Sequence, residues 1–264
     1  MLPATSLIPI HDENPTRTFS WLTVVLIGAN VAVFLLEPSF GQPPVPVDAA
    51  SAAAFCSTAE FFHQWGMIPH EVLNSRALDI DFTGCPAGTE VVGKSIYLSI
   101  LTSMFIHGGF LHLGGNMLFL WVFGNNIEDR LGKTRFILFY LLTGVAAALA
   151  HAFSNPASTV PTVGASGAVA GMLGAYLILF PRARITTIVP IFFLYIVKLP
   201  AMLVLVMWFG SQFLIGASQQ FGGAGVAWMA HVGGFLAGMA LIIPFGGRSG
   251  PPRRRRSSAP FPYN

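Results

Sequence analysis

The stretch "TVGASGAVAGMLGAY", residues 162–176, places the hydroxyl group of Ser166 in an apolar segment rich in small residues. One helical row through it contains Ser166, Ala170 and Gly174, and the adjacent row is equally small. Small residues at i, i+4 let two membrane helices approach closely. We therefore expect a helix that packs tightly against a second helix, with the serine at the contact.

The composition of the whole chain favours a membrane protein. Of the 264 residues, 53% are hydrophobic and 9% are charged, whereas about a quarter of an average soluble domain is charged. Several apolar blocks are long enough to cross a hydrocarbon core about 30 Å thick, and backbone inside lipid must be helical. We predict an all-α polytopic membrane protein with six transmembrane helices, at residues 19–36, 110–127, 136–153, 164–180, 199–215 and 226–245.

The distribution of Lys and Arg orients these spans. The outer loop, residues 38–95, holds six acidic residues and only Arg76 and Lys94 as basic ones. By the positive-inside rule, both termini should be cytoplasmic. The basic residues expected on that side are Arg17, Arg130, Lys133, Arg135, Arg182, Arg184, Arg248 and residues 253–256.

This topology divides the chain into three parts. We expect residues 1–18 to be a cytoplasmic segment, residues 19–245 to be the membrane domain with its extracytoplasmic loop, and residues 246–264 to be a disordered basic cytoplasmic tail. The first apolar block lacks a small-residue cleavage site, so we expect it to be retained as a span. The compact layout favours a multi-pass protein of a bacterial plasma membrane.

Two short apolar stretches and two cysteines lie outside the predicted spans. The stretch "ITTIVPIFFLYIV", residues 185–197, contains Pro190 and is short for a span, so we expect an interfacial or re-entrant segment. We interpret "IYLSILTSMFI", residues 96–106, in the same way. Cys56 and Cys85 share the outer loop, where either a disulfide or two free thiols would be possible.

Four polar side chains fall in one layer of three predicted spans. His112 and Asn116 lie in the second span, Ser166 near the start of the fourth, and His231 in the sixth. These spans run in the same direction, so Ser166 and His231 should differ in depth by only about 5 Å. A GxxxG pair lies on the face of His231 and suits close contact with the small face beside Ser166.

The residue types in this layer suit acyl transfer. A neutral histidine can take the proton of a serine hydroxyl as the oxygen attacks a carbonyl carbon. The His112 ring, the Asn116 amide and the Ser166 backbone N–H could then stabilise the oxyanion. The spans carry no carboxylate at this depth, which predicts a Ser166–His231 dyad without a third member.

Three motifs resemble those of the rhomboid intramembrane serine proteases and follow the order of that family. They are "HGGFLHLGGNM" at 107–117, "GASGAVAG" at 164–171 and "AHVGGFLAG" at 230–238. The resemblance covers about residues 96–245. It implies Ser166 as nucleophile, His231 as base, and His112, Asn116 and the backbone of Gly164 at the oxyanion site.

The resemblance also implies an activity, and the chain departs from the family pattern at one point. It implies an endopeptidase that cleaves single-span membrane proteins near the outer face of the bilayer, with the fifth span acting as a substrate gate. The Trp-Arg pair that many members carry in the first loop is absent, since Gly66 follows Trp65. We expect the partners to be transmembrane segments of single-span membrane proteins and the lipid bilayer. We expect no metal, no cofactor and no nucleic acid.

Alternatives stay open at this stage. A rhomboid-like protein without catalysis could bind membrane helices as a chaperone or degradation adaptor. A metal site at His107, His112 and His151 is disfavoured, because no HExxH motif or acidic partner accompanies them. The natural substrate, the cut site and the oligomeric state are not determined by the sequence.

Overall fold

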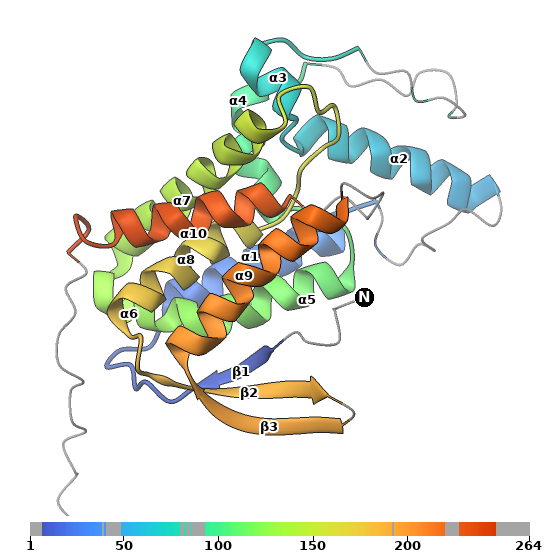
Figure 1. Cartoon of the computed structure of the whole chain (residues 1–264). Helices are drawn as coiled ribbons and strands as arrows, with labels where there is room; N and C mark the ends of the chain where they lie inside the picture. The colour runs from blue at the N-terminus through green and yellow to red at the C-terminus, as the bar shows by residue number, and fades with distance from the viewer. Residues whose placement is uncertain are drawn as a thin grey trace, which may run out of the picture.

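The computed structural model describes residues 7–38, 40, 49–79, 82, 85, 93–191, 193–219 and 227–246. It is mostly helical, in agreement with the predicted class, and its helices form a bundle around α8 (Figure 1). The predicted basic tail lies outside the described residues from residue 247 onward. The first helices in chain order are α1 (Trp21–Leu36), α2 (Ala49–Trp65), α3 (Pro69–Asn74), α4 (Ile96–Thr102) and the 3-10 turn η1 (Ser103–Phe105).

The remaining helices contain the three motifs. Helix α5, the π-helical turn η2 and α6 follow one another without a break, and Gly132 separates them from α7. The elements are α5 (Phe110–Phe119), η2 (Leu120–Gly124), α6 (Asn125–Leu131), α7 (Lys133–Ser154), α8 (Ser166–Leu179), α9 (Ala201–Gln219) and α10 (Trp228–Leu241).

Each of the six predicted spans contains a helix, but most of these helices are short. Within the described residues, only α7 is by itself long and apolar enough to cross a bilayer. The segments Ile96–Phe105 and Phe110–Leu131 form a second candidate, bent by 82°. The other apolar segments, α1, α8, α10 and the part Ala201–Leu214 of α9, measure 10–17 residues, so the count of six spans stays a prediction.

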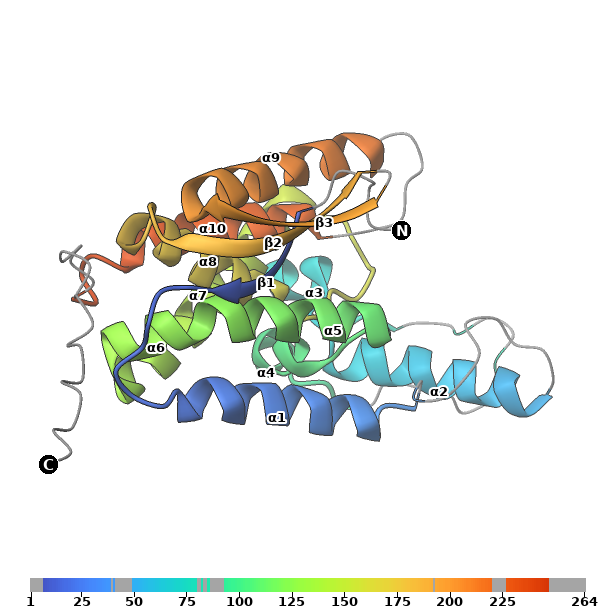
Figure 2. The same ribbon diagram turned by 90° about the horizontal axis from the view of Figure 1, so that it is seen from below.

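A three-stranded antiparallel sheet accompanies the helices and was not predicted. It is formed by β1 (Ile8–Asp12), β2 (Arg184–Ile191) and β3 (Phe193–Pro200) in that order. The stretch 185–197, expected to be an interfacial or re-entrant segment, is thus a β-hairpin, and part of the polar N-terminal segment is its neighbouring strand. The β-branched residues of "RITTIVPI" favour an extended backbone. Seen from below, the sheet lies between α5 and α9 (Figure 2), which β1 and the hairpin contact respectively.

Helix α8 is the centre of the bundle. All residues from 167 to 176 are buried. The predicted contact between the small faces of α8 and α10 is confirmed: a Cβ atom on Gly234 would overlap the carbonyl group of Gly167, and one on Gly238 would overlap that of Gly171. The two helices therefore touch backbone to backbone, as small residues in membrane helices allow.

A buried ion pair holds together parts of the predicted outer loop. The ammonium group of Lys94 pairs with Glu71 and donates a hydrogen bond to the carbonyl oxygen of Gly66, 3.0 Å away. Both charged side chains are almost fully buried, with 0% and 2% exposure. Burial lowers the pKa of Lys94, and the contact with Glu71 opposes this shift.

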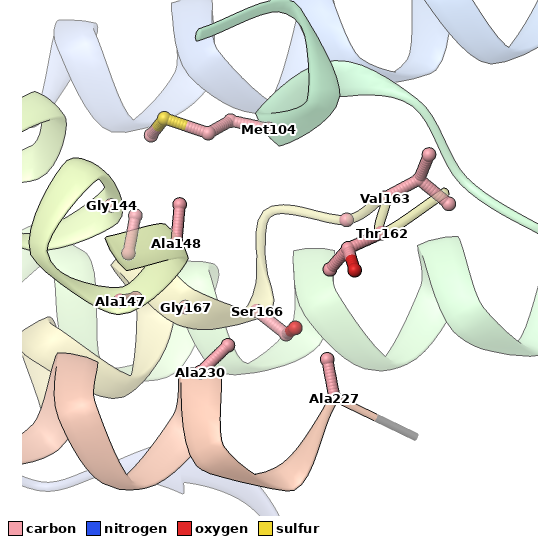
Figure 3. A pocket seen from close by; sticks show the side chains of 12 residues that line it. Met104, Gly144, Ala147, Ala148, Thr162, Val163, Ser166, Gly167, Ala227 and Ala230 are labelled. Carbon is pink, nitrogen blue, oxygen red and sulfur yellow. The ribbon is translucent and has the colours of Figure 1, made fainter. Parts of the chain in front are cut away.

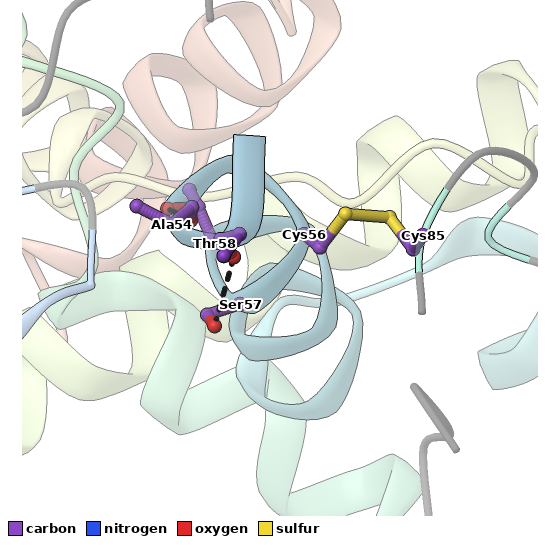
Figure 4. The surroundings of a disulfide bond; sticks show 6 residues. Ala54, Cys56, Ser57, Thr58 and Cys85 are labelled. Carbon is purple, nitrogen blue, oxygen red and sulfur yellow. Dashed lines mark hydrogen bonds between the residues drawn. A yellow bond between two sulfur atoms is a disulfide. The ribbon is translucent and has the colours of Figure 1, made fainter. Parts of the chain in front are cut away.

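Further contacts fix the same loop to the bundle. Thr102 donates to the carbonyl oxygen of Trp65 at 2.7 Å, and Met67 pairs with Thr162 just before the serine motif. Cys56 of α2 and Cys85 are joined by a disulfide, with a Cα–Cα distance of 5.7 Å (Figure 4). Of the two states left open by the sequence, the structure therefore has the disulfide.

Candidate active site

Ser166 and His231 are in direct contact, as the sequence-based packing argument expects. Ser166 is the first residue of α8, and His231 lies in the first turn of α10. Ser166 Oγ lies 2.8 Å from Nε2 of His231, across 65 residues of sequence. The backbone contacts between the two helices hold this distance, because neither helix can move closer or slide without a steric clash.

A tight turn before α8 presents the serine. Gly164 has a φ of +126°, a conformation that residues with a Cβ atom rarely adopt. Its N–H donates to the carbonyl oxygen of Ser103 at 2.8 Å, and the N–H of Ala165 donates to Nε2 of His107 at 3.4 Å. The turn is therefore held by the segment that precedes α5.

His112 and Asn116 lie one turn apart on α5, and His112 faces the serine turn. A Cβ atom on Gly164 would lie 2.7 Å from Nε2 of His112, so the ring lies directly against the serine turn. His112 Nδ1 accepts the N–H of Gly108 at 3.3 Å, which leaves Nε2 to carry the proton of a neutral ring. The buried amide nitrogen of Asn116 has no hydrogen-bond partner among the described residues.

The combination of these elements matches a known family. The sequence pattern of the Rhomboid domain matches residues 94–248, which is more than half of the chain and includes all five predicted site residues. The chain belongs to the rhomboid family. Rhomboid proteins are multi-pass membrane proteins, and the family includes serine proteases.

Individual rhomboid relatives come from plants, yeast and bacteria. The chain is 27% identical to RHOMBOID-like protein 1 of Arabidopsis thaliana over 230 residues, which cover 86% of this chain and 54% of that protein. It is 34% identical to the mitochondrial Rhomboid protein 1 of Saccharomyces cerevisiae over 153 residues, or 54% of this chain and 40% of the relative. It is 30% identical to Rhomboid protease GluP of Bacillus subtilis over 160 residues, covering 61% and 29% respectively. The chain thus spans about half or less of these three relatives.

A small cavity adjoins the serine of this rhomboid chain. Its volume is about 30 Å³. Figure 3 shows Ser166 beside it, with small side chains around it. Among the lining residues are Gly144, Ala147, Ala148 and Ala230. A space of this size has room for a water molecule or a methyl group rather than for a large side chain.

A further polar residue contacts His231 and is absent from the sequence-based prediction. Oε1 of Gln212, in the middle of α9, lies 2.7 Å from Nδ1 of His231. The side chain of Gln212 is buried, at 3% exposure. The signal that could have revealed it is an amide side chain inside the apolar fifth block, since such polar groups in membrane segments tend to be functional.

Of the three histidines considered as metal ligands, His112 lies against the serine turn, and the other two, His107 and His151, have different surroundings. His107 is fully buried, and its ring joins the carbonyl group of Phe105 to the N–H of Ala165. It therefore supports the serine turn. His151 is on α7, and its buried Nδ1 has no hydrogen-bond partner among the described residues.

Proposed function

We propose that this rhomboid protein is an intramembrane serine endopeptidase that cleaves single-span membrane proteins near the outer face of the bilayer. The observation that supports this most directly is the 2.8 Å contact between Ser166 Oγ and His231 Nε2. That distance is within the range in which a histidine can take the proton of a nucleophile during attack. The match to Rhomboid protease GluP is consistent with the same chemistry.

The proposed reaction has two halves. As Ser166 Oγ bonds to the scissile carbonyl carbon, its proton moves to His231 Nε2 and the carbonyl oxygen becomes an oxyanion. His231 then gives that proton to the departing amide nitrogen as the C–N bond breaks, which leaves an acyl-enzyme. In the second half, His231 accepts a proton from water, the water oxygen attacks the ester carbon, and the proton returns to Ser166 Oγ.

Two side-chain donors are available to the oxyanion. The Nε2–H of His112 lies against the serine turn, and the amide group of Asn116, without a hydrogen-bond partner in the described part of the chain, lies one helical turn further along α5. A buried donor without a partner is costly in a folded protein. This arrangement is expected of a site whose acceptor forms only during the reaction.

The surroundings of Ser166 favour a particular kind of substrate. A peptide bond within a helix is shielded by its own hydrogen bonds, so the substrate segment must unwind before attack. The small cavity favours a small residue at the cleaved bond, and helix-breaking residues nearby would assist unwinding. By family resemblance, we propose that the substrate enters past α9, and that the protein resides in a bacterial plasma membrane with both termini cytoplasmic.

The competing proposal is a rhomboid-like protein that binds membrane helices without cleaving them. A fluorophosphonate probe separates the two, because it reacts only with an activated serine. We expect labelling of the wild type, and none in Ser166→Ala or His231→Ala. Co-expression with single-span substrates should give cleavage that depends on Ser166. Equal processing by the wild type and Ser166→Ala, with no labelling of either, would contradict the protease proposal.

A further inference from the structure

We propose that Gln212 is a positioning residue that holds the imidazole of His231 in the tautomer and orientation needed to activate Ser166. The proposal rests on the proposed protease function. It adds a third helix to the catalytic unit, because Gln212 is on α9, whereas Ser166 and His231 are on α8 and α10. The two bonds of His231, 2.8 Å to Ser166 and 2.7 Å to Gln212, use both ring nitrogens.

The orientation of the Gln212 amide follows from its other contacts. Its Nε2 lies 3.1 Å from the carbonyl oxygen of Trp208, one turn earlier on α9, and 3.1 Å from Ser211 Oγ. A backbone carbonyl oxygen can only accept a hydrogen bond, so the atom that faces it must be the NH₂ group. The oxygen of the amide is therefore the atom that faces His231.

This orientation determines the tautomer of His231. An amide oxygen can only accept, so Nδ1 of His231 must carry a proton and donate it to Gln212. In a neutral ring, Nε2 is then unprotonated and can accept the hydroxyl proton of Ser166. The opposite tautomer would place two lone pairs against each other at Nδ1 and would leave no acceptor for the serine.

The burial of Gln212 makes the contact hard to replace. Gln212 is 3% exposed, so water has little access to the amide group that contacts Nδ1 of His231. The centroids of the Trp208 and His231 rings lie 6.0 Å apart. The backbone carbonyl oxygen of Trp208 accepts a hydrogen bond from the Gln212 amide and so fixes its orientation. The turn of α9 that contains Trp208 and Gln212 thus packs against the imidazole of His231 and determines which ring nitrogen carries the proton.

The test compares Gln212→Met with Gln212→Glu and Ser211→Ala. Methionine has a similar length and lacks a strong acceptor, glutamate keeps an acceptor oxygen, and alanine at 211 removes a neighbouring polar group but leaves the acceptor in place. We expect Gln212→Met to lower kcat for a single-span substrate about 100-fold with KM changed less than about 3-fold, since loss of the tautomer-fixing partner of a catalytic histidine costs up to about 10⁴-fold. The rate of fluorophosphonate labelling of Ser166 should fall in parallel.

The control variants and the protonation state of His231 complete the expected result. Gln212→Glu and Ser211→Ala should keep kcat within about 10-fold of the wild type. The ¹⁵N spectrum of histidine-labelled protein should show a protonated Nδ1 at His231 in the wild type and loss of that single tautomer in Gln212→Met. Wild-type kcat, labelling rate and ¹⁵N signal in Gln212→Met would overturn the proposal, as would equal losses in the Met and Glu variants. If the wild type itself neither cleaves nor labels, the protease function fails, while the ¹⁵N spectrum still decides the tautomer.

Discussion

A Cβ atom on Gly238 of α10 would overlap the carbonyl group of Gly171 on α8. The same relationship recurs one turn earlier, between Gly234 and Gly167. These contacts lie between backbones, which cannot rotate away as a side chain can. They fix both the separation and the relative depth of the two helices, and thereby the 2.8 Å contact of Ser166 with His231 near their N-terminal ends.

Gly238→Ala should therefore push α10 away from α8. We expect a loss of about 1–3 kcal/mol in the free energy of unfolding, the usual range for overpacking, and a cleavage rate at least 10-fold lower. Gly28→Ala is a matched control, because a Cβ atom on Gly28 of α1 would meet no atom within 4 Å. Thermal unfolding in detergent and a cleavage assay measure both effects. Equal stability and activity in the two variants would show that the helix contact does not set the site.

Gly164→Ala should impair catalysis through His112. The new Cβ atom would lie 2.7 Å from Nε2 of His112, and the φ of +126° would itself be strained. We expect kcat to fall at least 100-fold, because the proposed oxyanion donor must move.

Gly132→Ala separates the effect of backbone strain from the effect of the contact with His112. Gly132 also has a positive φ, +76°, but faces open space between α6 and α7. Both variants should lose stability from backbone strain, and only Gly164→Ala should lose most of its kcat. A similar kcat in both would contradict a role for the contact between Gly164 and His112.

Glu71→Gln should destabilise the outer loop. The substitution leaves the ammonium group of Lys94 buried without a counter-charge, and breaking a buried ion pair costs about 3–5 kcal/mol. The melting temperature and the protease resistance of the loop would report this loss. Glu13→Gln serves as the control, since Glu13 pairs with Lys198 at an exposed position where ion pairs contribute little. A melting temperature unchanged by Glu71→Gln would refute the anchoring role.

Asp12 should make stability depend on pH. Burial raises the pKa of this carboxyl group from 3.8 to about 6, against hydrogen bonds from the N–H of Asn14 and the hydroxyl of Tyr176. Because the folded state holds the proton more tightly, this stabilisation is complete below pH 3.8 and is lost as the pH rises to about 6.

The predicted size of this effect is up to about 3 kcal/mol, at about 1.4 kcal/mol for each unit of pKa. Asp12→Asn should remove it, whatever its effect on absolute stability. Denaturant titrations of both proteins at several pH values between about 4 and 7 would test it. Parallel pH profiles for the wild type and Asp12→Asn would rule out the assignment.

Much of the candidate site could be predicted from local sequence. Small residues around Ser166 and after His231 indicate two faces that can meet, and helical rise alone places both residues at one depth. The same reasoning did not find Gln212, because a single amide in an apolar block has no periodic signal. The sheet was missed because β1 and β2 are separated by more than 170 residues, so nothing local in either segment indicates their pairing.

Composition and periodicity were enough to predict a mostly helical, apolar chain in which a serine and a histidine lie on small-residue helix faces, because both are properties of short stretches of neighbouring residues. Three contacts could be found only in the folded chain: Gln212 with His231, the ring of His112 with Gly164, and the ion pair of Lys94 with Glu71. Those contacts join segments far apart in the chain. Their partners depend on how the helices pack, because hydrogen bonds and ion pairs act only over a few ångströms.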